Sequence, residues 1–274
     1  MQAAASLSSD LFPRRIVCLT EETTETLYLL GQEERIVGIS GYTVRPPRAR
    51  QEKPKVSAYL SAKIDRILDL EPDLVLGFSD LQADIASQLV RAGVAVHVFN
   101  QRTVAEILRM IAMVGAMVGA QAQAAALLAE LQQGLDAVAA AGRALPRRPR
   151  VYFEEWHEPI ITGIGWVSEL IGLAGGEECF PELAGKSLGK DRIVADPLEV
   201  VRRAPDVILG SWCGRKFRPE QVMARAGWES VPAVVNAQVF EIKSSEILQP
   251  GPAALTDGVR QIQRRLQDWA RLHA

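Results

Sequence analysis

The stretch Glu71-Pro-Asp-Leu-Val-Leu-Gly77 returns later in the chain as Ala204-Pro-Asp-Val-Ile-Leu-Gly210. In both copies proline disfavours helical backbone in the residue before it, and an apolar run follows. Each copy therefore predicts that a helix stops and a buried strand begins at once. A second pair of segments, residues 25–31 and 169–175, each predicts a helix that ends at glycine. We expect two related lobes.

Short β-branched runs recur along the chain, and segments with helical spacing separate most of them. Near-continuous apolar strands that alternate with helices are typical of parallel sheets covered on both faces. The predicted fold class is α/β. The predicted strands are residues 15–20, 35–40, 73–78, 94–99, 150–153, 206–210 and 238–242.

A long helix is predicted between the lobes. Thr103, followed three residues later by Glu106, forms a capping-box start, and helical signals continue with few breaks to Gly142. Residues 121–142 would span about 33 Å at 1.5 Å per residue, enough to connect two lobes and restrict their closure. The alternative is a helix within one domain. We divide the chain into lobes at residues 1–118 and 146–274, with the helix at 119–145. Its apolar stripe is Leu127, Leu128, Leu131, Leu135 and Val138.

Composition excludes several classes of protein. The 274 residues include 31 Lys and Arg and 33 Asp and Glu, so the net charge is −2. The chain therefore lacks the excess of basic residues that is typical of nucleic-acid-binding proteins. Three cysteines are an odd number, which favours reduced thiols over a disulfide scaffold. The most apolar stretch, residues 110–141, is interrupted by polar residues and glycines, so no membrane-spanning segment is expected.

The first fifteen residues lack the basic and apolar regions of a secretory signal. The sequence as it stands therefore predicts a cytoplasmic protein, or a periplasmic one if a leader has been removed. We expect a monomer.

Ligands in open parallel sheets gather beyond the carboxyl ends of the strands. Several aromatic rings fall there beside a few polar groups, which suits a large, partly apolar ligand. Each of these rings could instead belong to the core or the rim of a lobe. The strand-end candidates for ligand binding are Glu22, Tyr42, Phe78, Glu155, Trp156, Trp212 and Glu246.

No motif supports catalysis or a resident metal. Glu154 and Glu155 are neighbours in a predicted strand, so their side chains should point to opposite faces and not share one site. His157 has no second histidine at metal-binding spacing, and Cys213 has no histidine nearby in the sequence. We predict no catalytic residue, metal or cofactor. An alternative hypothesis is a cytosolic metal-handling protein or enzyme that uses Glu154, Glu155, His157 and Cys213.

A family resemblance extends from about residue 14 to 270. It is carried by Arg15-Ile-Val-Cys-Leu-Thr, Glu25-Thr-Leu-Tyr-Leu-Leu-Gly, Arg35-Ile-Val-Gly-Ile-Ser-Gly-Tyr42, Pro46-Pro47 and Glu71-Pro-Asp-Leu-Val. These segments resemble the cobalamin and iron-siderophore substrate-binding proteins of bacterial ABC importers. Gly41-Tyr42 with Pro46-Pro47, and Trp166-Val-Ser-Glu-Leu-Ile-Gly-Leu-Ala-Gly-Gly176, most resemble the cobalamin-binding branch.

The resemblance implies two Rossmann-like lobes with mainly parallel sheets, joined by one long α-helix, and a ligand cleft between the lobes. It implies non-catalytic binding of a corrinoid, or a related chelate or tetrapyrrole, for uptake through an ABC importer permease. By position, Tyr42, Tyr59, Phe78 and Trp156 match aromatic residues that contact the corrin. Asp65 and Glu199 match the acidic residues, one on each lobe, that dock onto the permease.

Overall fold

The computed structural model describes residues 11–273, which form two compact units. Unit 1 comprises the described residues up to Gln101 together with Leu108–Ala129, and unit 2 comprises Arg102–Ile107 and the residues from Glu130 onward. The prediction about a missing secretory signal rests mostly on residues 1–10, which lie outside the described residues. The boundary between the units falls within the long helix that the sequence predicts.

Unit 1 is built on a five-stranded sheet with the order β3-β2-β1-β4-β5, and every pairing is parallel. Its apolar core includes Val17, Leu19 and Val75, which are buried because the strands have helices packed against them. All four predicted strands of this lobe are confirmed. The strands are β1 (Ile16–Cys18), β2 (Ile36–Ser40), β3 (Lys55–Ser57), β4 (Leu74–Phe78) and β5 (Val96–Phe99).

Helices alternate with these strands. Helix α4 shows how the chain turns back to the sheet, because Gly93 takes a positive φ of 84° just after the helix and β5 follows. The helices are α1 (Glu21–Leu29), α2 (Ala49–Glu52), α3 (Ile64–Leu68) and α4 (Ala83–Arg91), with short 3₁₀ turns η2 (Glu33–Arg35) and η3 (Asp80–Gln82).

The predicted capping box starts helix α5 (Val104–Met117). The Thr103 hydroxyl accepts a hydrogen bond from the Glu106 backbone N–H at 3.2 Å, and Glu106 Oε2 accepts one from the Thr103 N–H at 3.1 Å. The helix ends near Gly119, whose φ is 71°, and α6 (Gln121–Arg143) follows as a separate helix. Of the predicted apolar stripe of α6, Leu131, Leu135 and Val138 are buried, whereas Leu127 and Leu128 are half-buried.

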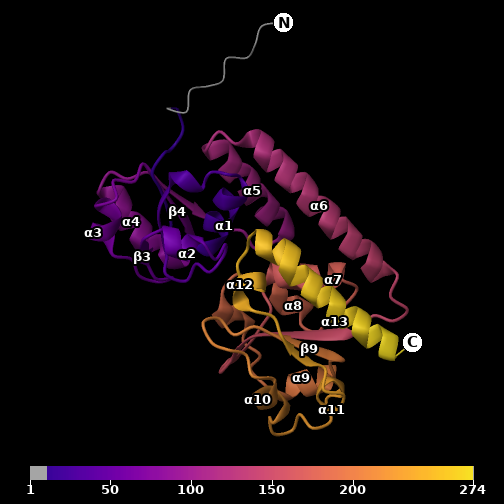
Figure 1. Ribbon diagram of the computed structural model, residues 1–274. Helices are drawn as coiled ribbons and strands as arrows, with labels where there is room; N and C mark the ends of the chain where they lie inside the picture. The colour runs from indigo at the N-terminus through magenta and orange to yellow at the C-terminus, as the bar shows by residue number, and fades with distance from the viewer. Residues whose placement is uncertain (1–10, 274) are drawn as a thin grey trace, which may run out of the picture. The chain divides into compact units, whose positions relative to one another are not determined.

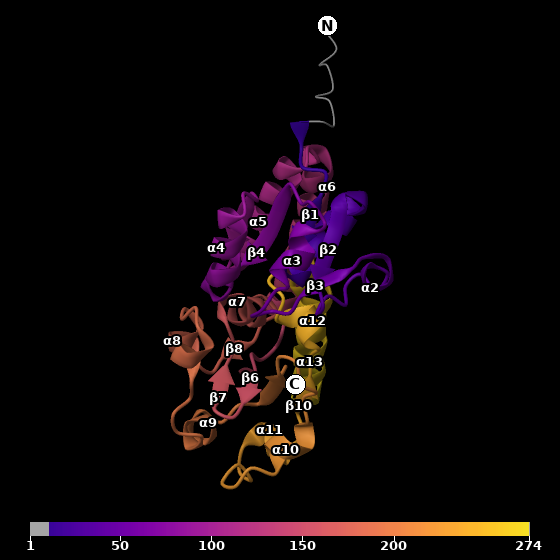
Figure 2. The same cartoon turned by 90° about the vertical axis from the view of Figure 1, so that its left-hand side faces the viewer.

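Unit 2 contains a second sheet with the order β10-β9-β6-β7, in which β8 also pairs with β6. The pairing is parallel except between β6 and β7, and the three strands β6, β7 and β8 lie side by side in Figure 2. The predicted α/β class is therefore confirmed in both units. The strands are β6 (Arg150–His157), β7 (Ile160–Thr162), β8 (Glu177–Glu178), β9 (Val207–Gly210) and β10 (Val239–Glu241).

Helices α7 and α13 pack against each other, and α13 also contacts β9 (Figure 1). A π-helical turn, η5 (Ala254–Gly258), leads directly into α13. The helices of this unit are α7 (Gly165–Leu173), α8 (Pro181–Ala184), α9 (Leu198–Arg203), α10 (Pro219–Met223), α11 (Pro232–Val235), α12 (Ser244–Ile247) and α13 (Val259–Leu272), with a 3₁₀ turn η4 (Gly189–Arg192).

The repeated Pro-Asp segments adopt the same backbone geometry in the two units. Glu71 and Ala204, which precede the prolines, both have a φ of 45° in the left-handed region. The carboxylate of Asp73 accepts the backbone N–H of Arg15, and that of Asp206 accepts the N–H of Arg150, each at the start of the neighbouring strand. The internal repeat is therefore a repeat of structure as well as of sequence.

Candidate functional site

The first turn of α1 places two acidic side chains at the carboxyl end of β1. Glu22 and its neighbour Glu21 are both buried. Glu21 Oε2 accepts the Val44 backbone N–H, and Glu22 Oε1 accepts the Thr20 hydroxyl at 2.6 Å. Burial raises the pKa of Glu21 to about 8 and that of Glu22 to about 7. The remaining oxygen of each carboxyl group has no hydrogen-bond partner among residues 11–273.

Tyr42 lies on the loop after β2, and 60% of the residue is exposed. The loop itself is fixed, because Arg50 donates to the carbonyl oxygens of Gly41 and Thr43 at 3.0 Å each. An exposed ring on a fixed loop can contact a ligand at a low cost in conformational entropy.

A buried amide connects the other two aromatic candidates of unit 1. The Gln82 side chain donates to the Tyr59 carbonyl oxygen at 3.0 Å and accepts the Phe78 backbone N–H at 2.9 Å. Tyr59 is half-buried, whereas the Phe78 ring is buried, so its predicted ligand contact stays a prediction. Sequence reasoning missed Gln82, because an isolated glutamine after a strand carries no pattern. Strand-end residues Ser79, Asp80 and Asn100 do line a cavity of about 630 Å³ beside α4.

In unit 2, Glu154 is a buried structural carboxylate. Arg225 binds both of its oxygens, at 2.5 and 2.8 Å, and the Tyr152 hydroxyl and the Trp212 Nε1–H each donate to it at 3.0 Å. Tyr152 and Trp212 belong to the core of the unit, and Arg225 is half-buried. Glu154 is therefore fully occupied by protein groups.

Glu155 points the other way, toward Arg192, which is only 1% exposed. The guanidinium binds the carboxylate through two contacts, of 2.7 and 2.9 Å. The Thr162 carbonyl oxygen also accepts a hydrogen bond from Arg192. The two neighbouring carboxylates thus have separate partners, which confirms that they do not share one site.

Three aromatic rings, called the ring stack below, lie against one another at the ends of β6 and β9, although only two of them are stacked face to face. The His157 ring lies 4.3 Å from that of Trp212, nearly parallel to it, and 5.0 Å from that of Trp156. Trp212 is 3% exposed, whereas Trp156 and His157 are half-buried. The outer two rings can therefore face a ligand, while Trp212 supports them from behind.

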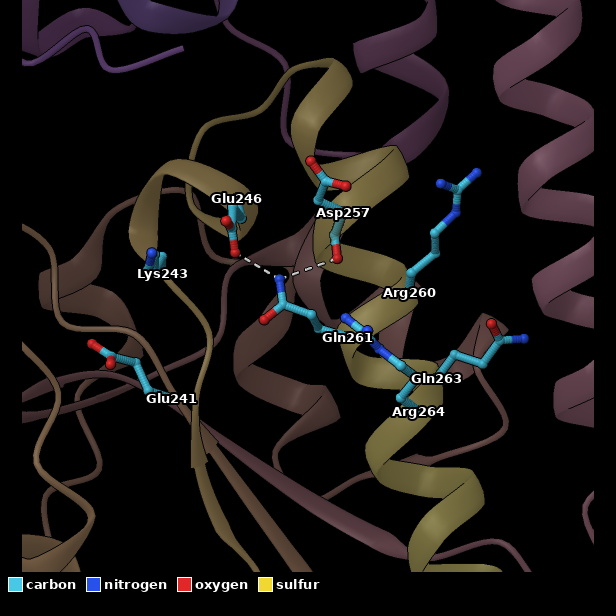
Figure 3. A pocket seen from close by; sticks show the side chains of 8 residues that line it. All are labelled: Glu241, Lys243, Glu246, Asp257, Arg260, Gln261, Gln263 and Arg264. Atoms are coloured by element: carbon cyan, nitrogen blue, oxygen red, sulfur yellow. Dashed lines mark hydrogen bonds between the residues drawn. The ribbon is translucent and has the colours of Figure 1, made fainter. Parts of the chain in front are cut away.

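Glu246 lies in α12, at the edge of a polar cavity of about 770 Å³. In Figure 3 the side chain of Gln261 points between Glu246 and Asp257, and its amide donates to Glu246 Oε2 at 2.6 Å and to the Asp257 carbonyl oxygen at 3.2 Å. Residues of α13 form the opposite wall. Glu246 therefore faces the polar cavity along α13.

The two acidic residues assigned to docking have different surroundings. Asp65 is exposed in the first turn of α3 and forms no ion pair with any residue from 11 to 273. Glu199 binds Arg202 at 2.7 Å and Arg203 at 2.9 Å. Asp65 is thus the more available of the two carboxylates.

The structure does not assemble the alternative metal or catalytic site. Cys213 is exposed, and Glu154 and Glu155 are each bound to an arginine. Within residues 11–273 no group of three His, Cys, Asp or Glu side chains is placed to hold a metal ion. In the same part of the chain no helix is both long and apolar enough to cross a membrane.

Comparisons with known proteins agree on one family. The profile of the family described as "Periplasmic binding protein" matches residues 16–246. An uncharacterized ABC transporter substrate-binding lipoprotein of Bacillus subtilis is 23% identical over 259 residues, covering 91% of this chain and 79% of that protein. A cobalamin-binding protein of Halobacterium salinarum is 26% identical over 258 residues, covering 90% of this chain and 68% of that protein.

Among solved structures, a periplasmic heme-binding protein of Roseiflexus in its apo form has a TM-score of 0.80. The two chains are 21% identical, and the match covers 94% of this chain and 99% of the other. At this level of identity the similarity shows the fold alone, and it confirms the predicted fold class.

Proposed function

Because the chain belongs to the periplasmic binding protein family and is a substrate-binding protein rather than an enzyme, we propose that it binds a corrinoid, or a related tetrapyrrole or chelate, for uptake through an ABC importer. The cobalamin-binding relative from Halobacterium supports the corrinoid. This role implies a permease partner and a location outside the cytoplasmic membrane, and the ABC transporter substrate-binding relative supports it.

One observation supports the proposed class of ligand: aromatic rings lie at the carboxyl ends of strands in both units. Tyr42 is exposed on a fixed loop of unit 1, and Trp156 and His157 are half-buried over Trp212 in unit 2. Flat apolar rings with few polar neighbours suit a large flat ligand.

Calorimetric titration of the purified chain with cyanocobalamin, dicyanocobinamide and haemin tests the proposal. We expect a dissociation constant of about 1 µM or lower for at least one of them, since stacked rings bury substantial apolar area. Binding of none of the three would overturn the proposed function.

Tyr42→Ala tests the contact in unit 1. The affinity should fall about tenfold, because the substitution removes a stacked ring and leaves an already exposed position. Leu29→Ala is the matched control, since Leu29 is 51% exposed in the same unit. Unchanged affinity of the Tyr42 variant would remove this residue from the site.

We also propose that Asp65 docks onto the permease, with Glu199 as the second contact. A free exposed carboxylate can receive an arginine of a partner, whereas Glu199 would have to exchange its present arginines. Asp65→Arg should lower permease-coupled uptake at least tenfold without changing ligand affinity. Asp69→Arg, a charge reversal at the end of the same helix, is the control. Normal uptake by the Asp65 variant would exclude this docking contact.

A further inference from the structure

Arg215 lies against the ring stack of unit 2 but has no carboxylate partner. Its Nη1 is 3.2 Å from His157 Nε2, and its guanidinium carbon is 5.9 Å from the centre of the Trp156 ring. Arg215 is exposed, and it forms no ion pair with any residue from 11 to 273. An arginine presents five N–H donors, and only one is engaged by a side chain here.

The other arginines of this region are occupied. Arg192 is bound to Glu155 and Arg225 to Glu154, and the exposed Arg218 lies 3.6 Å from Glu220. Glu154 and Glu155, which directly precede Trp156 in the chain, are therefore neutralised by other partners. Glu158 contacts the ring stack through its backbone carbonyl oxygen, which accepts the Trp156 Nε1–H at 2.9 Å.

The surface beneath Arg215 is rigid. The His157 ring stacks on Trp212, and the indole of Trp212 is held by the buried Glu154 carboxylate. Because arginine can only donate, His157 Nε2 is the acceptor in this contact. Arg215 thus provides a fixed positive charge at the rim of a flat aromatic surface.

From this geometry we infer that Arg215 is a specificity-determining residue, which selects a flat ligand bearing a carboxylate on the rim of its ring system. The inference rests on the proposed function and narrows its substrate class to tetrapyrrole or corrinoid acids. A guanidinium binds a carboxylate through two parallel, charge-assisted hydrogen bonds, about twice as strong as neutral ones. A fully amidated macrocycle offers only neutral carbonyl oxygens, so it gains much less from Arg215.

Two corrinoids that share one macrocycle provide the test. The side chains of dicyanocobyrinic acid end in carboxylates, whereas those of dicyanocobinamide are amides. Calorimetry should show at least tenfold tighter binding of the acid by the unaltered chain. Arg215→Gln should reduce affinity for the acid about tenfold and change affinity for the amide less than twofold. Arg218→Gln, in the same loop, is the control and should leave both affinities unchanged.

The possible failures are distinguishable. If the unaltered chain binds both corrinoids without preference, or if Arg215→Gln weakens both equally, the inference is wrong and the proposed function stands. If the unaltered chain binds neither corrinoid nor haemin, the proposed function itself fails and the inference falls with it.

Discussion

Units 1 and 2 share one backbone turn at the Pro-Asp segments, called the shared corner below. They differ in how the acidic side chains near the sheet are paired. In both, a residue with a φ of 45° precedes Pro-Asp, and the aspartate holds the start of the adjacent parallel strand. In unit 1 the acidic pair beyond the first strand, Glu21 and Glu22, is buried and forms no ion pair with an arginine among residues 11–273. In unit 2 each carboxylate of the pair Glu154 and Glu155 binds its own arginine. A duplicated backbone therefore does not prescribe the same charge pattern.

The largest expected effect comes from breaking the paired arrangement of unit 2. Arg225→Met leaves the buried Glu154 carboxylate uncompensated and should lower the free energy of unfolding by about 3–5 kcal/mol. All five tryptophans lie in unit 2, so urea unfolding followed by tryptophan fluorescence reports this unit alone.

The double variant Glu154→Gln, Arg225→Met is the control, because no charge is left buried at this position. It should regain a substantial part of the lost stability. A single variant as stable as the original chain would show that the ion pair does not stabilise unit 2.

Removing the unpaired charge of Glu21 in unit 1 should stabilise the protein, whereas breaking the ion pair of unit 2 destabilises it. Since burial raises the pKa of Glu21 from 4.5 to about 8, the folded state holds a proton that the unfolded state releases. Stability from this group is fully present below pH 4.5 and is lost as the pH rises toward 8. Glu21→Gln should therefore be more stable than the original chain at pH 8.5, by a few kcal/mol, and nearly equal to it at pH 4.5.

Thermal unfolding followed by circular dichroism at both pH values measures this difference. Glu34→Gln, at an exposed site of the same unit, should leave the pH dependence unchanged. A Glu21→Gln variant that is less stable at pH 8.5 would mean that the charged carboxylate is needed for folding.

The smallest effect addresses the shared corner. Glu71→Gly and Ala204→Gly each relieve a side chain in left-handed backbone and should raise stability by about 0.5–1 kcal/mol, equally in the two units. Ala92→Gly, at a helix end with a φ of −82°, should give no gain. Unequal gains at the two corners, measured by urea unfolding, would show that their strain differs.

Most of the fold could be predicted because it depends on local signals. The apolar runs, the glycine helix ends and the Thr103–Glu106 capping box all act within a few residues. Strands β3, β7 and β8 escaped prediction, because none of them lies in an apolar or β-branched run longer than three residues, whereas the predicted segments that contain the equally short β1 and β10 are longer.

The candidate site was harder to predict, because its determinants are distant in sequence. Glu154 binds Arg225, which lies 71 residues later in the chain, and no sequence pattern near Glu154 indicates this partner. For the same reason Trp212 was assigned as a ligand contact like any strand-end ring, although its side chain lies behind His157. Strand-end reasoning locates the region of a site, but contacts across the unit decide which residues there remain accessible.

Gly210, at the end of β9, has an evolutionary consequence. A β-carbon at this position would collide with the ring of Phe217, which packs edge-on against Trp212. Position 210 therefore cannot gain a side chain while the Phe217 ring is in place. In the family's history, any lineage that gained a side chain at position 210 should first have lost the aromatic ring at 217, and such paired changes would mark branches in which the ring stack, and with it ligand choice, was rebuilt.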